Sequence, residues 1–117
     1  MIKMNDIQDL IHRQIILELT IRTFKRDSTK LEQLKMYKEF SGWFDVKIKE
    51  LQQELINIKS ELGKQGVKIQ GKKAEDEMTV YTVLIKGRAE TRRYFNVALR
   101  NWVGEETKRL LGLPFRT

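Results

Sequence analysis

The sequence predicts an α+β protein that is mostly α-helical, with a long antiparallel helical hairpin, a two-stranded β-ribbon and a C-terminal helix. Three observations carry this prediction. Between Leu34 and Leu62, apolar residues recur at alternating steps of three and four, which is the heptad seam of a long amphipathic helix. After Gly66 the pattern changes to the in-and-out alternation of β-strands, and after Gly87 helical spacing returns.

Length and composition favour one domain of an ordinary helix-rich class. The 117 residues are enough to bury a core, with the hairpin expected in 1–65 and the ribbon and last helix in 66–117. The sequence has no cysteine, which excludes disulfides and cysteine-based zinc sites. No apolar run approaches the ~20 residues of a membrane span, and the N-terminus lacks the apolar core of a signal peptide. We therefore expect a cytoplasmic protein with no membrane partner.

The first helix is expected to be central, because its apolar residues cover several faces. Asn5 is its expected cap, and Asp27 and Ser28 end it. Thr29 followed by Glu32 has the spacing of a capping box and predicts that the second helix begins there. A connection this short predicts two antiparallel neighbours. The apolar residues of the first helix are Ile7, Leu10, Ile11, Ile15, Ile16, Leu17, Leu19 and Ile21.

The second helix is expected to run from about Thr29 to about Leu62, with Gly63 and Gly66 as the stop signal. Its seam spans roughly 42 Å, whereas a first helix of about 20 residues reaches only ~30 Å. The hairpin alone would therefore leave the far end of the seam uncovered. Either the C-terminal unit or a second copy of the chain is expected to bury it, since an exposed apolar stripe is an aggregation liability. The residues predicted as an oligomer interface, in a homo-oligomer with a dimer favoured, are Leu51, Leu55, Ile58 and Leu62.

The C-terminal half is expected to hold two strands and one helix. The strands are 67–70 and 79–86, joined by the polar loop 71–77. A third helix is expected from about Ala89 to Leu111. Its expected buried row is Phe95, Ala98, Leu99, Trp102 and Val103.

The net charge of +7 is uneven, with +2 in residues 1–65 and +5 in residues 66–117. Arg88, Arg92, Asn96 and Arg100 recur every four residues and predict a basic stripe along the third helix. Such a stripe could follow a phosphate backbone, although a solvated helix face normally carries similar residues. The residues predicted as a nucleic-acid or anion site are Lys72, Lys73, Lys86, Arg88, Arg92, Arg93 and Arg100.

No pattern indicates catalysis, a metal or a cofactor. His12 is the single histidine and has no partner for a zinc pair. The acidic run 75–77 has no calcium-loop spacing and is typical of a solvated turn. An aromatic group at helical spacing either lines a ligand pocket or belongs to the core, and the core is favoured, so no small-molecule ligand is predicted. Its members are Tyr37, Phe40, Trp43 and Phe44.

Two functions follow as hypotheses. The first is a small non-enzymatic binding or assembly protein that self-associates through its long amphipathic helix. The alternative is a non-specific nucleic-acid-binding protein that uses the basic stripe.

Overall fold

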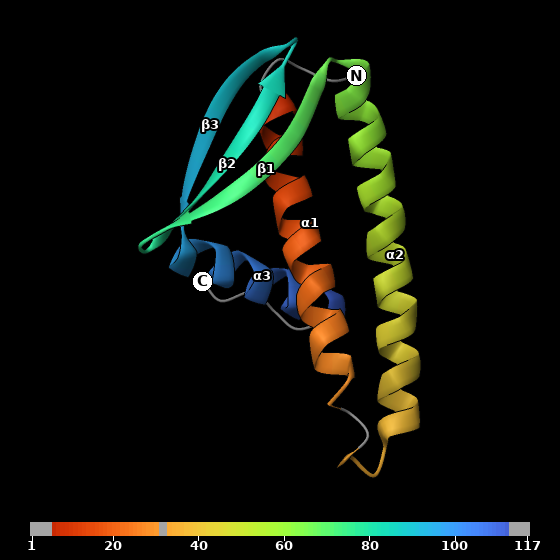
Figure 1. Ribbon diagram of the computed structural model, residues 1–117. Helices are drawn as coiled ribbons and strands as arrows, with labels where there is room; N and C mark the ends of the chain where they lie inside the picture. The colour runs from red at the N-terminus through yellow and green to blue at the C-terminus, as the bar shows by residue number, and fades with distance from the viewer. Residues whose placement is uncertain (1–5, 31–32, 113–117) are drawn as a thin grey trace.

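The computed structural model describes residues 6–30 and 33–112. The chain is α+β and mostly helical, as predicted, but its sheet has three antiparallel strands (Figure 1). Among the described residues, no helix combines the length and apolar character needed to cross a membrane. The elements in chain order are α1 (Asp6–Ser28), α2 (Tyr37–Lys64), β1 (Val67–Glu75), β2 (Met78–Ile85), β3 (Arg88–Phe95) and α3 (Asn96–Leu111).

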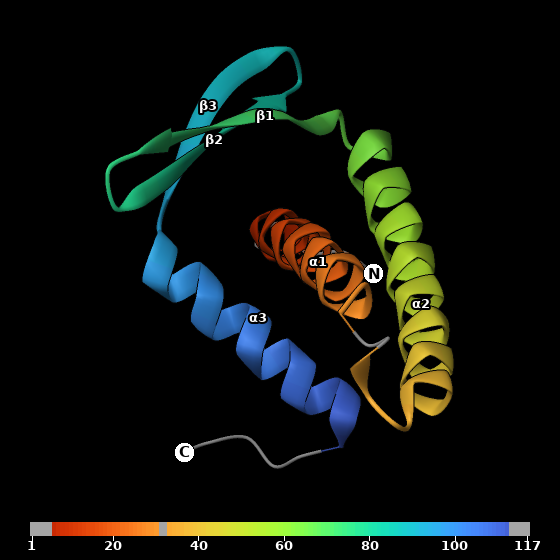
Figure 2. The same cartoon turned by 60° about the horizontal axis from the view of Figure 1, so that its bottom comes forward.

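Helix α1 is the centre of the fold, as its broad apolar surface predicts. Figure 2 shows the sheet, α2 and α3 arranged around it. Ile15 and Leu17 are fully buried, and Ile11 is 1% exposed. They form one cluster with buried residues of α2, the sheet and α3. Because α1 contacts all the other layers, its sequence is apolar around most of its circumference.

The predicted start of α2 is wrong, because Thr29 ends α1 and does not open the next helix. The Thr29 hydroxyl donates a hydrogen bond to the Arg26 carbonyl at 2.7 Å, and the Ser28 hydroxyl donates to the Lys25 carbonyl at 2.9 Å. These bonds satisfy carbonyls that the end of a helix leaves free. Helix α2 begins only at Tyr37. The other expected capping residues, Asn5 and Glu32, lie outside the described residues.

The later start of α2 changes which parts of the two helices meet. The rings of Phe24 and Phe44 have centroids 5.2 Å apart, and Arg13 Nε lies 2.7 Å from a carboxylate oxygen of Glu54. The connection 29–36 therefore displaces α2 along α1, so that the start of α1 lies beside the end of α2. With this offset, α1 covers the end of the seam that would be exposed if α2 began directly after α1.

The predicted oligomer interface is consequently inside the subunit. Leu51 and Leu62 are each 1% exposed, Ile58 is 8% exposed, and Leu55 is half-buried against the same core. The expectation that this end of the seam is uncovered is wrong. This end of the seam is covered because α1 and α2 are offset along their axes. The prediction assumed a short connection, which does not permit this offset.

The segment 88–95 is a strand and not the first part of a helix. All eight residues of β3 pair with β2, from Arg88 opposite Ile85 to Phe95 opposite Met78. The intervening Lys86 and Gly87 have φ values of 51° and 81°, the left-handed pair that a tight hairpin turn requires. Ala, Glu and Arg favour helices by local propensity. Here the pairing with β2 outweighs that preference, so the expected β-ribbon is a three-stranded sheet.

Strand β1 also runs further than predicted. It extends through the expected loop 71–77 as far as Glu75, so Lys72 and Lys73 are strand residues. A bulge interrupts the pairing between Ile69 and Gly71. Such an insertion changes which residues face the core. As a result Lys72 pairs with the buried Tyr81, and its Nζ lies 5.9 Å from the centroid of that ring.

Candidate ligand-binding groove

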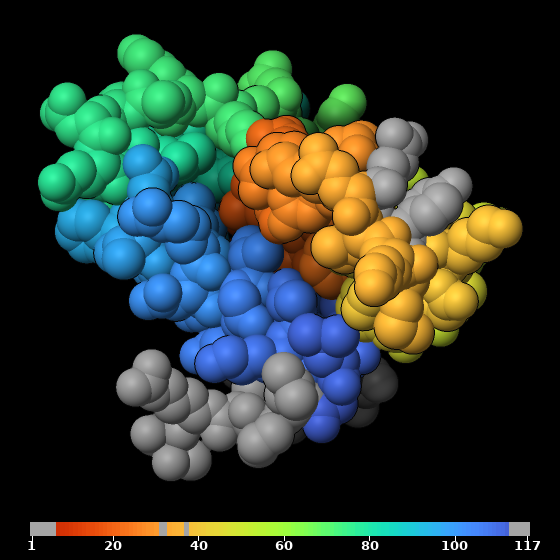
Figure 3. Space-filling model, turned by 90° about the horizontal axis from the view of Figure 1, so that it is seen from below, coloured from red at the N-terminus to blue at the C-terminus, as the bar shows by residue number. Residues whose placement is uncertain are grey.

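The three helices diverge at one end of the molecule and leave a groove between them. Its walls are the C-terminal end of α1, the first turns of α2 and the C-terminal end of α3, which Figure 3 shows on one face. The cavity has a volume of about 620 Å³, within the range of small-molecule sites. We call it the apolar groove, and its main lining residues are Phe24, Phe40, Trp43, Phe44, Thr107 and Leu111.

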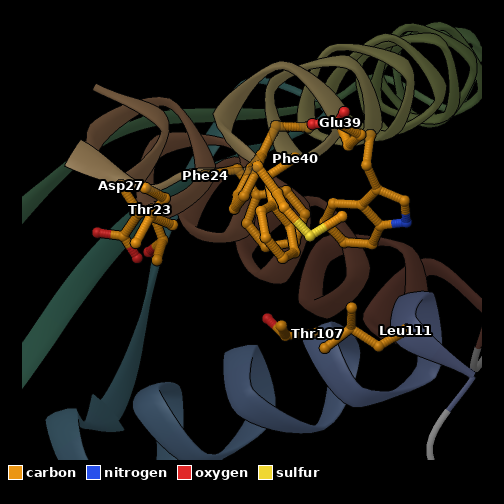
Figure 4. A pocket seen from close by; sticks show the side chains of 11 residues that line it. Thr23, Phe24, Asp27, Glu39, Phe40, Thr107 and Leu111 are labelled. Carbon is orange, nitrogen blue, oxygen red and sulfur yellow. The ribbon is translucent and has the colours of Figure 1, made fainter. Parts of the chain in front are cut away.

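Aromatic rings form the back wall of the apolar groove. The centroid of the Phe24 ring lies 5.8 Å from that of Trp43, and the centroids of Trp43 and Phe44 are 5.2 Å apart in an edge-to-face arrangement. Figure 4 shows Thr107 and Leu111 of α3 facing this wall across the cavity. Trp43 and Phe44 also pack against the core, which agrees with the core interpretation of these two residues, and they line the cavity as well.

Large apolar side chains remain exposed around this groove. Phe40 is 46% exposed and Leu111 is 51% exposed; Met36 and Leu34, which line the same cavity, are also exposed. Single exposed apolar residues are normal on a protein surface, but a contiguous group marks an interaction site. Sequence reasoning assigned Leu34 and Phe40 to a buried helix surface. In the structure Leu34 precedes α2 and both residues lie beside the cavity.

A second cavity of about 690 Å³ lies between α1 and the first three turns of α3. Leu19, Leu99 and Val103 give it an apolar floor. We call it the basic groove, because the cations that line it are Arg26, Arg100 and Lys108. Only Arg100 belongs to the predicted site. Arg26 and Lys108, in the last turns of α1 and α3, are not part of that site.

The other side of the helical layer is closed by an ion cluster. Arg13 of α1 binds Glu54 of α2 in a bidentate manner, at 2.7 and 3.0 Å, and Glu106 of α3 likewise, at 2.6 and 3.0 Å. Arg109 adds a further hydrogen bond to Glu106. One guanidinium therefore joins all three helices, with the planar geometry that suits arginine.

The charges of this cluster depend on one another. Burial opposes the ionisation of Glu106, but the hydrogen bonds from Arg13 and Arg109 outweigh it and lower the pKa of Glu106 to about 2. The hydrogen bonds to Glu106 and Glu54 raise the pKa of Arg13. Glu106 is only 6% exposed, and a buried carboxylate without these partners would be strongly destabilising.

The predicted basic stripe is not continuous in the structure. Of its members only Asn96 and Arg100 lie on α3, whereas Arg88 and Arg92 lie on the edge strand β3. Arg92 binds Glu90 at 3.0 Å and Gln8 at 3.1 Å, and Arg93 binds Glu75 at 2.9 Å on the outer side of the sheet. The prediction of one helical surface is wrong, because β3 replaces the first part of the expected helix. The remaining cations are Lys72 and Lys73 in β1 and Lys86 in the β2–β3 turn.

The residues considered from the sequence for catalysis or a metal lie in different elements, with His12 in α1, Glu75 in β1, and Asp76 and Glu77 between β1 and β2. His12 packs edge-on against Trp102, with ring centroids 4.5 Å apart, and burial lowers its pKa. Glu75 pairs with Arg93 on the outer sheet surface. Within residues 6–30 and 33–112, no group of three side chains is placed to hold a metal ion.

Comparisons with known proteins place the chain in a family. The family model described as "YhjD protein" matches residues 1–115. A protein of Bacillus subtilis (strain 168), described as "Uncharacterized protein YhjD", is 32% identical over 113 residues, which cover 95% of this chain and 94% of that protein. No solved structure is significantly similar. The chain therefore belongs to the YhjD protein family.

Proposed function

We propose that this protein is a small, non-enzymatic, cytoplasmic binding protein that holds an apolar ligand in the apolar groove. The observation that supports this proposal is a cavity of about 620 Å³ with an aromatic wall, open at the surface between the three helices. The sequence predicted no small-molecule ligand, because aromatic residues at helical spacing usually belong to a core. The position of Phe40 and Trp43 beside a cavity is the reason to revise that expectation.

Ligand binding would be driven by the burial of apolar surface in the apolar groove that is exposed to water in the free protein. Transfer of apolar surface from water gives about 25 cal/mol per Å², and a preformed pocket requires little reorganisation of the protein. The aromatic pairs that hold Phe24, Trp43 and Phe44 in place make the wall rigid before a ligand arrives.

The tryptophan in the groove offers a direct measurement. Trp102 is replaced by Phe, so that Trp43 is the only tryptophan, and dodecanol is added below its solubility limit. We expect a saturable change in the Trp43 fluorescence. Phe40→Glu should weaken binding at least about tenfold, because it places a charge beside the apolar chain.

A matched control is available on the same helix. Val46 is 53% exposed, close to the 46% of Phe40, but does not line the groove. Val46→Glu should therefore leave dodecanol binding unchanged. Absence of saturable binding to the parent protein, or equal losses in both variants, would refute the proposal.

Self-association is the second candidate function, and the exposed apolar rim of the groove favours it. The rim residues Leu34, Met36, Phe40 and Leu111 could pack against the same residues of a second chain, as in a symmetric dimer. Light scattering tests this at rising protein concentration. A dimer that Phe40→Glu dissociates, and that Val46→Glu leaves intact, supports it; a monomer at all concentrations contradicts it.

A further inference from the structure

The two cavities are successive parts of one groove along α3. The residues of α3 that line them recur at steps of three and four and so form one broad helical face. Thr107 of α3 and Thr23 of α1 line both cavities. The α3 residues of that face, from one end of the helix to the other, are Asn96, Leu99, Arg100, Val103, Gly104, Thr107, Lys108 and Leu111.

The two parts of this groove differ in charge. The charged residues of the apolar groove are Asp27 and Glu39, both acidic, whereas those of the basic groove are all cations. Within the described part of the chain, the only carboxylate within 4 Å of Arg26, Arg100 or Lys108 is Asp27, at 3.4 Å from Arg26 in an exposed pair. An exposed pair of this kind contributes little, so these cations are available to an anion.

We propose that the ligand is a fatty-acid-type anion, a single molecule with a carboxylate and an unbranched alkyl chain. The chain lies in the apolar groove, and the carboxylate lies among Arg26, Arg100 and Lys108. This assignment rests on the proposed function, because it adds the head group to the same site. Glu39 at the apolar end favours this orientation, since a carboxylate beside it would be repelled.

The surroundings of the cations also fit a carboxylate attached to an alkyl chain. Arg26 and Arg100 can each offer two parallel N–H donors to its oxygens, and Lys108 adds a compact positive charge. Leu19, Leu99 and Val103 lie beside these cations. A small inorganic anion would leave this apolar floor and the whole apolar groove in water, whereas an alkyl chain covers both.

A matched pair of ligands tests the head group separately from the chain. Dodecanoate and dodecanol have the same chain and differ in charge at pH 7.5. In the Trp102→Phe background, we expect dodecanoate to bind about tenfold more tightly than dodecanol, because charge-assisted hydrogen bonds add to the apolar burial. High salt should reduce this preference.

Removing charges from the basic groove tests whether its cations cause the preference for dodecanoate. The double variant Arg100→Gln, Lys108→Gln should bind dodecanol like the parent protein and lose the preference for dodecanoate. The control is Lys86→Gln, Arg88→Gln, which removes the same charge from the β2–β3 turn and should keep the preference.

The outcomes distinguish this inference from the proposed function. Equal binding of dodecanol and dodecanoate overturns the assignment of an anion and leaves the apolar-ligand proposal standing. Loss of the preference in the control variant as well overturns the basic groove as its site. Binding of neither ligand overturns both proposals. Sedimentation with anionic phosphatidylglycerol vesicles, without saturable dodecanoate binding, overturns the single-molecule ligand in favour of a membrane surface.

Discussion

The two sides of the helical layer are packed differently, closely on one side and with a cavity on the other. Around Arg13, the three helices are joined by carboxylates of α2 and α3, and the neighbouring Ile11 and Ile15 are almost completely buried. Around Phe24 the same three helices diverge, and a cavity of about 620 Å³ remains between them. Both regions contain apolar residues that are almost completely buried, Ile11 and Ile15 in one and Phe24 in the other, so hydrophobicity alone does not determine which of them is filled.

This difference indicates that the half-buried Arg13, by bonding to two other helices, fixes the helix spacing on one side only. Arg13 requires Glu54 and Glu106 within hydrogen-bonding distance, which holds α2 and α3 against α1 there. Beyond the crossing of α1 and α3, no comparable contact joins α3 to the start of α2 among the described residues. A binding protein gains from this arrangement, because the stable side supports a preformed cavity on the other.

The largest expected effect is a difference in unfolding free energy between side-chain truncations on the two sides of the helical layer. Ile15→Ala should lower the free energy of unfolding by about 2–5 kcal/mol, because it creates a cavity at a fully buried position. Phe40→Ala at the groove should cost less than about 1 kcal/mol, since the side chain is 46% exposed. Urea denaturation of both variants measures this. Equal losses would mean that the groove side is packed as tightly as the core.

The next largest effect is expected when the negative charge of Glu106, which joins the helices on the filled side, is removed. Glu106→Gln should destabilise the protein by about 2–3 kcal/mol, because it removes the charge-assisted hydrogen bonds of a buried carboxylate and leaves the half-buried Arg13 with Glu54 as its acidic partner among the described residues. Glu105→Gln is the control, since Glu105 is the exposed neighbour and should change stability by less than about 0.5 kcal/mol. Thermal or urea unfolding compares them, and equal stability of the two variants would contradict a structural role for the ion cluster.

Acid should weaken the same contact without a mutation. The pKa of Glu106 is lowered to about 2 in the folded state, so its contribution is present above the unfolded value of about 4.5 and is lost as the pH falls. Between pH 5 and pH 3 we expect a loss of roughly 2 kcal/mol from this group. The difference in unfolding free energy between the parent and Glu106→Gln, measured at both pH values, should shrink by that amount. A difference that does not change with pH would contradict this pKa.

The smallest effect concerns the nucleic-acid alternative. Arg100 lies on the groove side, away from the cations of the sheet, so Arg100→Glu should change affinity for duplex DNA by less than about twofold at moderate salt. Fluorescence anisotropy at several salt concentrations measures this. A steep salt dependence together with a large loss in the variant would restore a basic surface that includes Arg100.

Much of the fold could be predicted from local patterns. The seam from Phe44 to Leu62 does face the core, and the broad apolar surface of α1 does mark the central helix. The β-branched and aromatic residues of 79–86 identify β2 almost to the residue. These predictions succeed because periodicity reports directly which side of an element is buried.

The parts that could not be predicted depend on contacts between distant segments. Strand β3 has helix-favouring residues, and only pairing with β2 makes it extended; the dipeptide Lys86-Gly87 was the available signal for the hairpin. The groove has no local signal, because it arises where helices diverge. Thr107 and Leu111 were therefore interpreted as parts of an ordinary helix end, and Phe24 was not noticed.

The connection 29–36 acts as a spacer that sets the alignment of α1 and α2. Each residue removed from it would shorten the distance that the connection can span by up to ~3.6 Å. A shift of one turn would separate Arg13 from Glu54 and move Trp43 away from Phe24. We therefore expect relatives of this family to tolerate substitutions in the spacer far better than deletions, an unusual constraint for a segment that links two helices.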